Sequence, residues 1–265
     1  MDVNSLQTNN LSLNSVVLDL DGVLWIGGSL GQGAAAFLDL LKREGLPFCI
    51  LTNDCSVSKV DRYNSLTRAG LTLNDEQLLT APEVTRDWLR DAGVRTIMYL
   101  GAPRALTDLT KELRVREVAP VDAVVVGDLF AHFDRGAIDR AVKAISQGAI
   151  LVAMQRNQRW FDGIEWHVDN GFWVAGLEYV TGRQAVVTGK PYSPAYKSAL
   201  TRLGLTVPSN TFFVSDDIMS DLRGAKNFGL KAVYFGSQST VPPWVDYVVG
   251  DFSSLASLLI GEKHG

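Results

Sequence analysis

The stretch SVVLDLDG, residues 15–22, begins with an apolar, β-branched run and ends in two aspartates and a glycine. Such a run predicts a buried strand. Asp19 and Asp21 lie two residues apart at its end, so both carboxylates can point the same way. Gly22 lets the backbone turn tightly there. Because α/β sheets bind ligands at the carboxyl ends of their strands, the pair is a candidate site. A turn or a helix cap would explain a lone aspartate pair equally well.

Strand and helix patterns alternate on both sides of a long middle section. The helical GAAAFLDLLKREG (33–45) and the apolar PFCILTN (47–53) follow the first strand. Near the end, TFFVSDD (211–217) leads to the helical SDLRGAKNFG (220–229) and to KAVYFG (231–236). This order is typical of a parallel α/β sheet.

The middle section repeats the same alternation. It contains three strand-like runs and a helical pattern between the last two: TIMYLG (96–101), AVVVGDLF (123–130), DRGAIDRAVKAISQG (134–148) and AILVAMQ (149–155). The sequence therefore predicts an α/β protein with a Rossmann-like parallel-sheet core. We expect this discontinuous core to comprise residues 1–80 and 186–265, with a second α/β domain inserted at 81–185.

Composition excludes several classes of function. The 265 residues are 46% hydrophobic, enough for a sizeable core, and 25 Lys and Arg against 29 Asp and Glu give a net charge of -4. No basic excess favours nucleic acid, and no run of about 18 apolar residues predicts a membrane span. The first residues lack a signal-peptide pattern, so we expect a soluble, cytoplasmic protein. Cys49 and Cys55 are too few for a disulfide framework, and we expect reduced thiols.

Three further segments end or follow strand-like runs with polar groups. Thr52 and Asn53 offer a hydroxyl and an amide suited to phosphate oxygens, and Lys190 in TGKPY offers a cation. Each alone is more often a cap or a surface group. Because all of these segments end or follow strands, their polar groups are expected to converge at one sheet edge, which indicates a site.

The third of these segments, FFVSDDIMSD, supplies the acids Asp216, Asp217 and Asp221, one of which can merely cap the helix that follows. Two carboxylates about 4 Å apart repel by about 4 kcal/mol at an effective dielectric near 20. Gathering Asp19, Asp21 and these acids therefore requires a cation. Ligands that are all oxygen, with no histidine at ligand spacing, favour Mg²⁺.

The four segments, in order, resemble the four motifs of the haloacid dehalogenase (HAD) superfamily of phosphatases: DLDGVL (19–24), LTN (51–53), GKP (189–191) and SDDIMSD (215–221). The long insertion between the second and third motifs, with GKP as the third, is similar to the NagD-like or p-nitrophenylphosphatase branch. That branch carries a large α/β cap domain at this place. The resemblance covers nearly the whole chain.

The resemblance implies a phosphatase mechanism. Asp19 would attack phosphorus and form an aspartyl phosphate, and Asp21 would act as general acid and then as general base. Thr52, Asn53 and Lys190 would bind the transferring phosphoryl group.

The resemblance also implies the ligands of Mg²⁺. These would be the Asp19 carboxylate, the backbone carbonyl of Asp21 and the Asp216 carboxylate. Asp221 or Asp217 would support the ion through water.

Two positions depart from the family pattern. Ser215 stands where the fourth motif usually has glycine, which can alter the approach of this loop to the metal. Asp54 and Cys55 follow Asn53, where relatives commonly have Asn, Thr or Ala. A carboxylate at position 54 would weaken anion binding unless it points away.

In this branch the cap domain selects the substrate, which we expect to be a small phosphorylated metabolite. Arg156, Arg159 and Trp160 are the candidate specificity residues, with Trp166 beside them and Asp128 and Phe133 as weaker candidates. Packing within the cap, or a homodimer formed through it, explains the aromatics equally well.

Three other functions compete with hydrolysis of phosphate esters. A catalytically weak or inactive binding or regulatory protein need not retain Asp19, Asp21 and Lys190 together. A 2-haloacid dehalogenase would need neither Asp21 nor the acidic segment at 215–221. A nucleotide-binding oxidoreductase would show G-x-G-x-x-G after the first strand, where DGVLWIGG stands instead.

Overall fold

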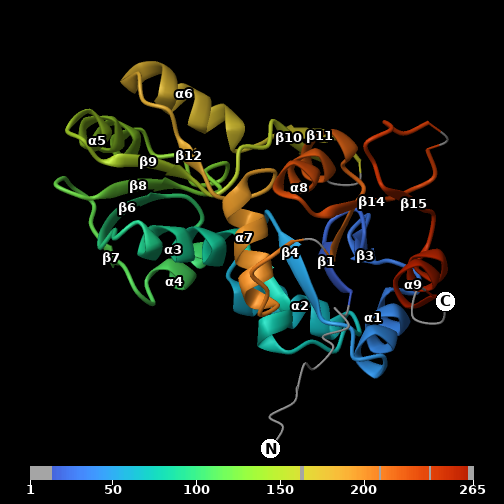
Figure 1. The fold of residues 1–265 in the computed structure, drawn as a ribbon. Coiled ribbons are helices and arrows are strands. Elements are labelled where there is room, and N and C mark those ends of the chain that lie inside the picture. The colour runs from blue at the N-terminus through green and yellow to red at the C-terminus, as the bar shows by residue number, and fades with distance from the viewer. Residues whose placement is uncertain (1–13, 162–163, 209, 239, 262–265) are drawn as a thin grey trace, which may run out of the picture.

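Two parallel β-sheets with helices packed on both faces make up the protein (Figure 1). The structure is a computed structural model that describes residues 14–161, 164–208, 210–238 and 240–261. In it, the first sheet contains six strands in the spatial order β15 (Tyr247–Val249), β14 (Lys231–Phe235), β13 (Thr211–Ser215), β1 (Ser15–Asp19), β4 (Phe48–Thr52) and β5 (Leu78–Thr80). We call this unit the core.

The second sheet belongs to the inserted section, which we call the cap. Across its described residues the strand order is β12 (Val186–Val187), β9 (Ile150–Ala153), β8 (Ala123–Val126), β6 (Thr96–Leu100) and β7 (Arg114–Val115). All neighbouring strands in both sheets run parallel. Two short antiparallel hairpins complete the strands: β2 (Trp25–Ile26) with β3 (Ser29–Leu30), and β10 (Arg159–Phe161) with β11 (Trp166–Val168).

The helices alternate with these strands along the chain. They are α1 (Ala34–Arg43), α2 (Lys59–Arg68), α3 (Ala81–Asp91), α4 (Pro103–Leu109), α5 (Arg135–Ser146), α6 (Gly171–Thr181), α7 (Ser193–Arg202), α8 (Arg223–Phe228) and α9 (Phe252–Gly261). Short helical turns η1 (Asp75–Gln77) and η2 (Ile218–Leu222) precede β5 and α8.

Strand β1 shows why the core sheet lies in the middle of the molecule. All five of its residues are buried, because helices cover both faces. Val16 and Leu18 pack with α1 and α9 on one face, whereas Val17 packs with α7 and α8 on the other. The carboxyl ends of β1, β4 and β13 therefore meet at one edge, where Asp19 and Ser215 end their strands.

The cap sheet is covered in the same way, with α5 and α6 on one face and α3 and α4 on the other (Figure 1). The predicted division at residues 80/81 falls between β5 and α3. The predicted second division, before Val186, differs from the structure, because β12 pairs with β9 of the cap sheet. An apolar run such as AVV suits either sheet, so its pairing cannot be read from sequence. Buried hydroxyls of Thr85 and Thr188, 2.7 Å apart, join the two places where the chain crosses between core and cap.

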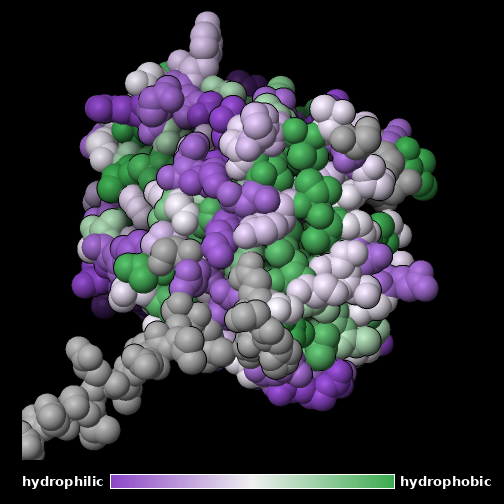
Figure 2. All heavy atoms as spheres, turned by 45° about the vertical axis from the view of Figure 1, so that its right-hand side comes forward, coloured by the Kyte–Doolittle hydropathy of each residue, from purple (hydrophilic) through white to green (hydrophobic). Residues whose placement is uncertain are grey.

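The surface mixes polar and apolar groups. On the face shown in Figure 2, hydrophobic side chains gather in a band down the middle and hydrophilic ones surround it. Such a mixture is typical of folded proteins, whose accessible surface is more than half apolar. None of the helices in the described part of the chain combines the length and the apolar character needed to cross a bilayer.

Candidate active site

A buried lysine joins two of the predicted acids. Lys190 Nζ lies 2.5 Å from Asp19 Oδ1 and 2.6 Å from Asp221 Oδ2. All three side chains are buried, and they come from the end of β1, the segment after β12 and the turn η2. The backbone N–H of Leu20 also donates to Asp19 Oδ1, at 2.7 Å. Burying charges is costly unless they are paired, so this contact fixes how the segments converge.

Burial changes the protonation of this cluster. It raises the pKa of Asp221 to about 7 and raises the pKa of Asp19 above its usual value, although Lys190 opposes both shifts. Burial alone would lower the pKa of Lys190, but the two carboxylates raise it overall. The lysine is therefore cationic at neutral pH, and it is outnumbered by the surrounding acids.

Ser215 is part of this cluster, a role that the sequence did not suggest. Its Oγ donates to Asp19 Oδ2 at 3.1 Å and lies 3.5 Å from Asp221 Oδ2. It also accepts the backbone N–H of Asp217 at 3.1 Å. The expected effect of the departure from glycine was on the loop alone. The structure shows instead a hydroxyl that contacts the carboxylate of Asp19.

The fourth-motif acids occupy three different environments. The Asp216 carboxylate lies against Gly22: a Cβ added to this glycine, whose φ is +83°, would meet Asp216 Cγ at 2.2 Å. Desolvation raises the pKa of Asp216 to about 6, although its side chain still reaches solvent. Asp217 Oδ1 accepts the N–H of Ser220 at 2.9 Å and so caps η2. Asp221 bonds to Lys190 as described above.

Thr52 lies beside Asp21, as expected from its place at the end of β4. Its hydroxyl is 3.5 Å from Asp21 Oδ2, to which it donates, and it accepts the backbone N–H of Asp54 at 3.1 Å. Asp21 itself is exposed and can be reached by a ligand. The structure therefore gathers Asp19, Asp21 and Thr52 at one edge of the core sheet.

Asn53 makes a contact that differs from the expected one. Its Oδ1 accepts the backbone N–H of Lys190, and its Nδ2 donates to the backbone carbonyl of Lys190, both at 2.9 Å. Nδ2 also lies 3.4 Å from Asn157 Oδ1 in the cap. The resemblance predicts that Asn53 binds the phosphoryl group, and this stays a prediction. The structure shows that the side-chain amide of Asn53 holds the backbone of Lys190.

The charge of Asp54 is neutralised. Its Oδ2 accepts Nε of Arg62 at 2.9 Å and also a bond from Nη2, while Oδ1 accepts the N–H and hydroxyl of Ser56 at 2.9 and 2.6 Å. Arg62 comes from the first turns of α2. Arg62 therefore offsets the repulsion that the Asp54 carboxylate would exert on an anion. The two residues are eight positions apart, and no short sequence motif predicts that they pair.

Comparison with known proteins decides the family. Residues 16–114 match the family model of the haloacid dehalogenase-like hydrolases, and residues 187–253 match a second model described as HAD-hydrolase-like. The rat haloacid dehalogenase-like hydrolase domain-containing protein 2 is 30% identical over 223 residues, 83% of this chain and 83% of that protein. The chain belongs to the haloacid dehalogenase-like hydrolases.

Proteins with a phosphatase name have the same fold over most of this chain. Ribonucleotide monophosphatase NagD of Escherichia coli K12 is 26% identical over 84% of this chain and 87% of its own. The solved NagD structure superposes with a TM-score of 0.81, covering 91% of this chain and 97% of NagD at 24% identity. A glycerol phosphate phosphatase of Mycobacterium tuberculosis, solved with magnesium, gives a TM-score of 0.80 at 24% identity over 92% and 77% of the two chains. The predicted NagD-like branch is confirmed.

The residues of this hydrolase fit a magnesium ion with few protein ligands. Within the described ranges, no three His, Cys, Asp or Glu side chains are grouped around one point as ligands. The available donors are the carboxylates of Asp19 and Asp216 and the backbone carbonyl of Asp21, and the charge of Asp216 contributes to the raised pKa of Asp19. Mg²⁺ characteristically takes one or two carboxylates and keeps several waters. Asp216 is exposed, so an ion can reach it, and a bound cation would offset the desolvation that raises its pKa to about 6.

The predicted specificity residues contact other residues of the cap. Arg156 forms a two-pronged ion pair with Glu178 of α6, at 2.6 and 3.2 Å. The Arg159 guanidinium lies 4.4 Å from the Trp166 ring centre, and Trp160 stacks on His167 at 4.8 Å. Arg156 therefore fits the alternative interpretation, in which these side chains stabilise the cap itself. Arg159 and Trp160 remain on a hairpin surface, where Trp160 is 46% exposed.

The weaker cap candidates also make local contacts. Phe133 stacks on Trp173 with ring centres 5.1 Å apart. Asp128 Oδ1 accepts the backbone N–H of Phe130 at 3.0 Å. Both cysteines are buried, and neither forms a disulfide.

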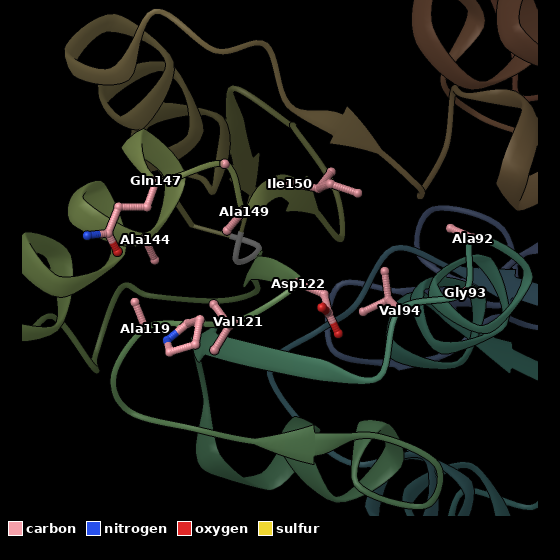
Figure 3. A pocket seen from close by; sticks show the side chains of 12 residues that line it. Ala92, Gly93, Val94, Ala119, Val121, Asp122, Ala144, Gln147, Ala149 and Ile150 are labelled. Atoms are coloured by element: carbon pink, nitrogen blue, oxygen red, sulfur yellow. The ribbon is translucent and has the colours of Figure 1, made fainter.

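A cavity of about 430 Å³ lies elsewhere, at the amino ends of the cap strands (Figure 3). Val121 and Asp122 precede β8, and Ala149 precedes β9, so the cavity is at the opposite end of the cap sheet from the loops that reach the core. Ligands of α/β sheets bind at the carboxyl ends of strands. The cavity is therefore separate from the candidate active site.

We expect Gly22→Ala to disable the site without unfolding the protein. The new methyl group would displace the Asp216 carboxylate that lies against Gly22. Gly28→Ala is the matched control, because Gly28 has a similar φ of +81° and open space around it. Turnover of p-nitrophenyl phosphate and thermal unfolding should be measured for both. If the two variants turned over substrate equally fast, the activity would not depend on the position of the Asp216 carboxylate beside Gly22.

Removing Arg62 should expose the charge of Asp54. In Arg62→Gln the Asp54 carboxylate loses its cationic partner near the site of the anionic substrate, so kcat/KM for a phosphate ester should fall about tenfold, as about 1.4 kcal/mol of repulsion would give. Asp54→Asn in the same protein removes that charge and should restore most of the loss. Failure of the double variant to recover would show that Arg62 acts other than by neutralising Asp54.

Proposed function

We propose that this hydrolase cleaves small phosphate monoesters with Mg²⁺, through a phosphoryl group carried on Asp19. The buried contact of Asp19 with Lys190, beside further acids at one sheet edge, is the observation that carries this proposal. A carboxylate paired with a lysine there can approach an anionic substrate. The names of the relatives, ribonucleotide monophosphatase and glycerol phosphate phosphatase, agree with this reaction class.

The first step forms a bond from an Asp19 oxygen to phosphorus while the bond from phosphorus to the ester oxygen breaks. Asp21, exposed two residues along, gives its proton to the departing oxygen. In the second step a water attacks phosphorus and passes its proton to Asp21, and Asp19 is released with inorganic phosphate. Two displacements replace one more difficult one.

Lys190 and Thr52 bind and orient the transferring group. The ammonium offsets the negative charge that gathers as phosphate meets Asp19, and a fixed charge in a buried site acts more strongly than one in water. The Thr52 hydroxyl, next to Asp21, is in place to donate to a phosphate oxygen.

Asp19, Asp216 and the carbonyl of Asp21 would hold Mg²⁺, which supplies charge stabilisation on the phosphate oxygens when bound. Asp221 bonds to Lys190 and to Ser215. We assign it the role of second acceptor for the lysine. Asp217 caps η2 and has no part in this scheme.

The charge and the exposed side chains of the protein indicate its binding partners. A small phosphorylated metabolite is the substrate, and the net charge of -4 disfavours nucleic acid. On the cap, α6 exposes Phe172 (62%) and Tyr179 (89%). We propose that a second copy of the chain covers this face, since exposed aromatics of this kind are enriched in interfaces.

Replacing the nucleophile tests the proposal. The wild-type protein should hydrolyse p-nitrophenyl phosphate with Mg²⁺ and lose this activity in EDTA. Asp19→Asn should lower kcat by at least about a thousandfold, because a neutral amide cannot attack phosphorus. Asp39→Asn, an exposed change on α1, is the matched control. Turnover retained in the Asp19 variant would exclude a phosphoryl group carried on that residue.

A further inference from the structure

The loop after β9 brings a cap side chain into contact with the catalytic segments of the core. Asn157 Oδ1 accepts a hydrogen bond from Asn53 Nδ2 at 3.4 Å, across 104 residues of sequence. The same loop packs closely there. A Cβ added to Gly189 would lie 2.3 Å from the carbonyl oxygen of Met154 and 2.6 Å from Asn53 Oδ1. Only glycine leaves room for this approach.

Asn157 is itself held firmly by the cap. Its backbone N–H donates to Oε1 of the buried Gln155 at 2.6 Å. Gln155 Nε2 donates to Asp169 Oδ1 at 2.7 Å, and the Asp169 carboxylate also accepts from the Asn157 side chain. Because Asn157 Oδ1 is the acceptor for Asn53, its Nδ2 is the atom that donates to Asp169. Both ends of the amide are thus assigned.

On the core side, Asn53 uses the rest of its amide on the backbone of Lys190, with both bonds at 2.9 Å. Lys190 in turn reaches Asp19. A continuous series of hydrogen bonds therefore leads from Asp169 of the cap through Asn157 and Asn53 to the lysine.

We propose that Asn157 is a positioning residue for the reaction, a role that rests on the proposed phosphatase function. It orients the Asn53 amide, which fixes the backbone from which Lys190 extends to Asp19. The cap thereby contributes to the chemistry of the core for every substrate. A residue that touched the leaving group would instead affect some substrates and spare others.

The first experiment replaces the amide by a side chain of similar size without hydrogen-bonding atoms. Asn157→Leu should lower kcat about fivefold, the size expected for one long neutral hydrogen bond. The loss should be equal for p-nitrophenyl phosphate, a bulky ester, and acetyl phosphate, a small phosphate donor. Gln158→Leu, the same change at the exposed neighbouring residue, should match the wild type. A loss that varies with the leaving group, or no loss, would overturn the proposal.

A double-mutant cycle tests whether Asn157 acts through Asn53. In an Asn53→Ala background, Asn157→Leu should change kcat less than twofold, because the group through which it acts is gone. Additive losses would overturn the proposal. A wild-type protein with no activity on any phosphate ester would contradict the proposed function itself, which separates the two failures.

A polarity swap keeps the test decisive if the leucine variant unfolds. Asn157→Asp places two carboxylates together and should lower kcat, and Asp169→Asn removes the acceptor of the Asn157 amide and should also lower it. The double variant restores a carboxylate and an amide in reversed order, with an acceptor still facing Asn53, and should recover wild-type turnover. Lack of recovery in a folded double variant would refute the positioning role.

Discussion

The buried contact of Lys190 with Asp19 and Asp221 is the constraint on which the rest of the site depends. Three charged side chains from distant segments lie out of solvent, and none of them tolerates burial without the others. The contact therefore favours one arrangement of β1, the segment after β12 and η2. The same arrangement leaves excess carboxylate at the sheet edge, which a divalent cation and a phosphoryl group can use.

The placement of the cap follows from the same edge. Cap strand β9 ends in a loop that reaches the core, where residues after β9 contact Asn53 and Gly189. The cavity at the other end of the cap sheet makes no such contact with the core. Cap and core thus meet at the carboxyl ends of strands, as ligand sites of α/β sheets do. Asn53 links the two domains, since it forms hydrogen bonds with Lys190 in the active site and with Asn157 in the cap.

The sequence predicted the α/β class, the family and the gathering of Asp19, Thr52 and Lys190, because strand ends are local signals and parallel strands bring them together. It did not reveal that Asn53 binds a backbone, nor that Arg62 neutralises Asp54. Those contacts depend on side-chain directions across separate elements, which no spacing encodes. The sequence analysis assigned Val186 to the core, whereas its strand pairs with the cap sheet. The composition of an apolar run does not indicate which strand it pairs with.

A crystal structure with Mg²⁺ and beryllium fluoride tests the account most directly, since beryllium fluoride imitates a phosphoryl group on a carboxylate. We expect the fluoride complex on an Asp19 oxygen, Lys190 beside it, and the metal bound by Asp19, Asp216 and the Asp21 carbonyl. Density for the complex at another side chain, or a metal bound without Asp216, would contradict the account.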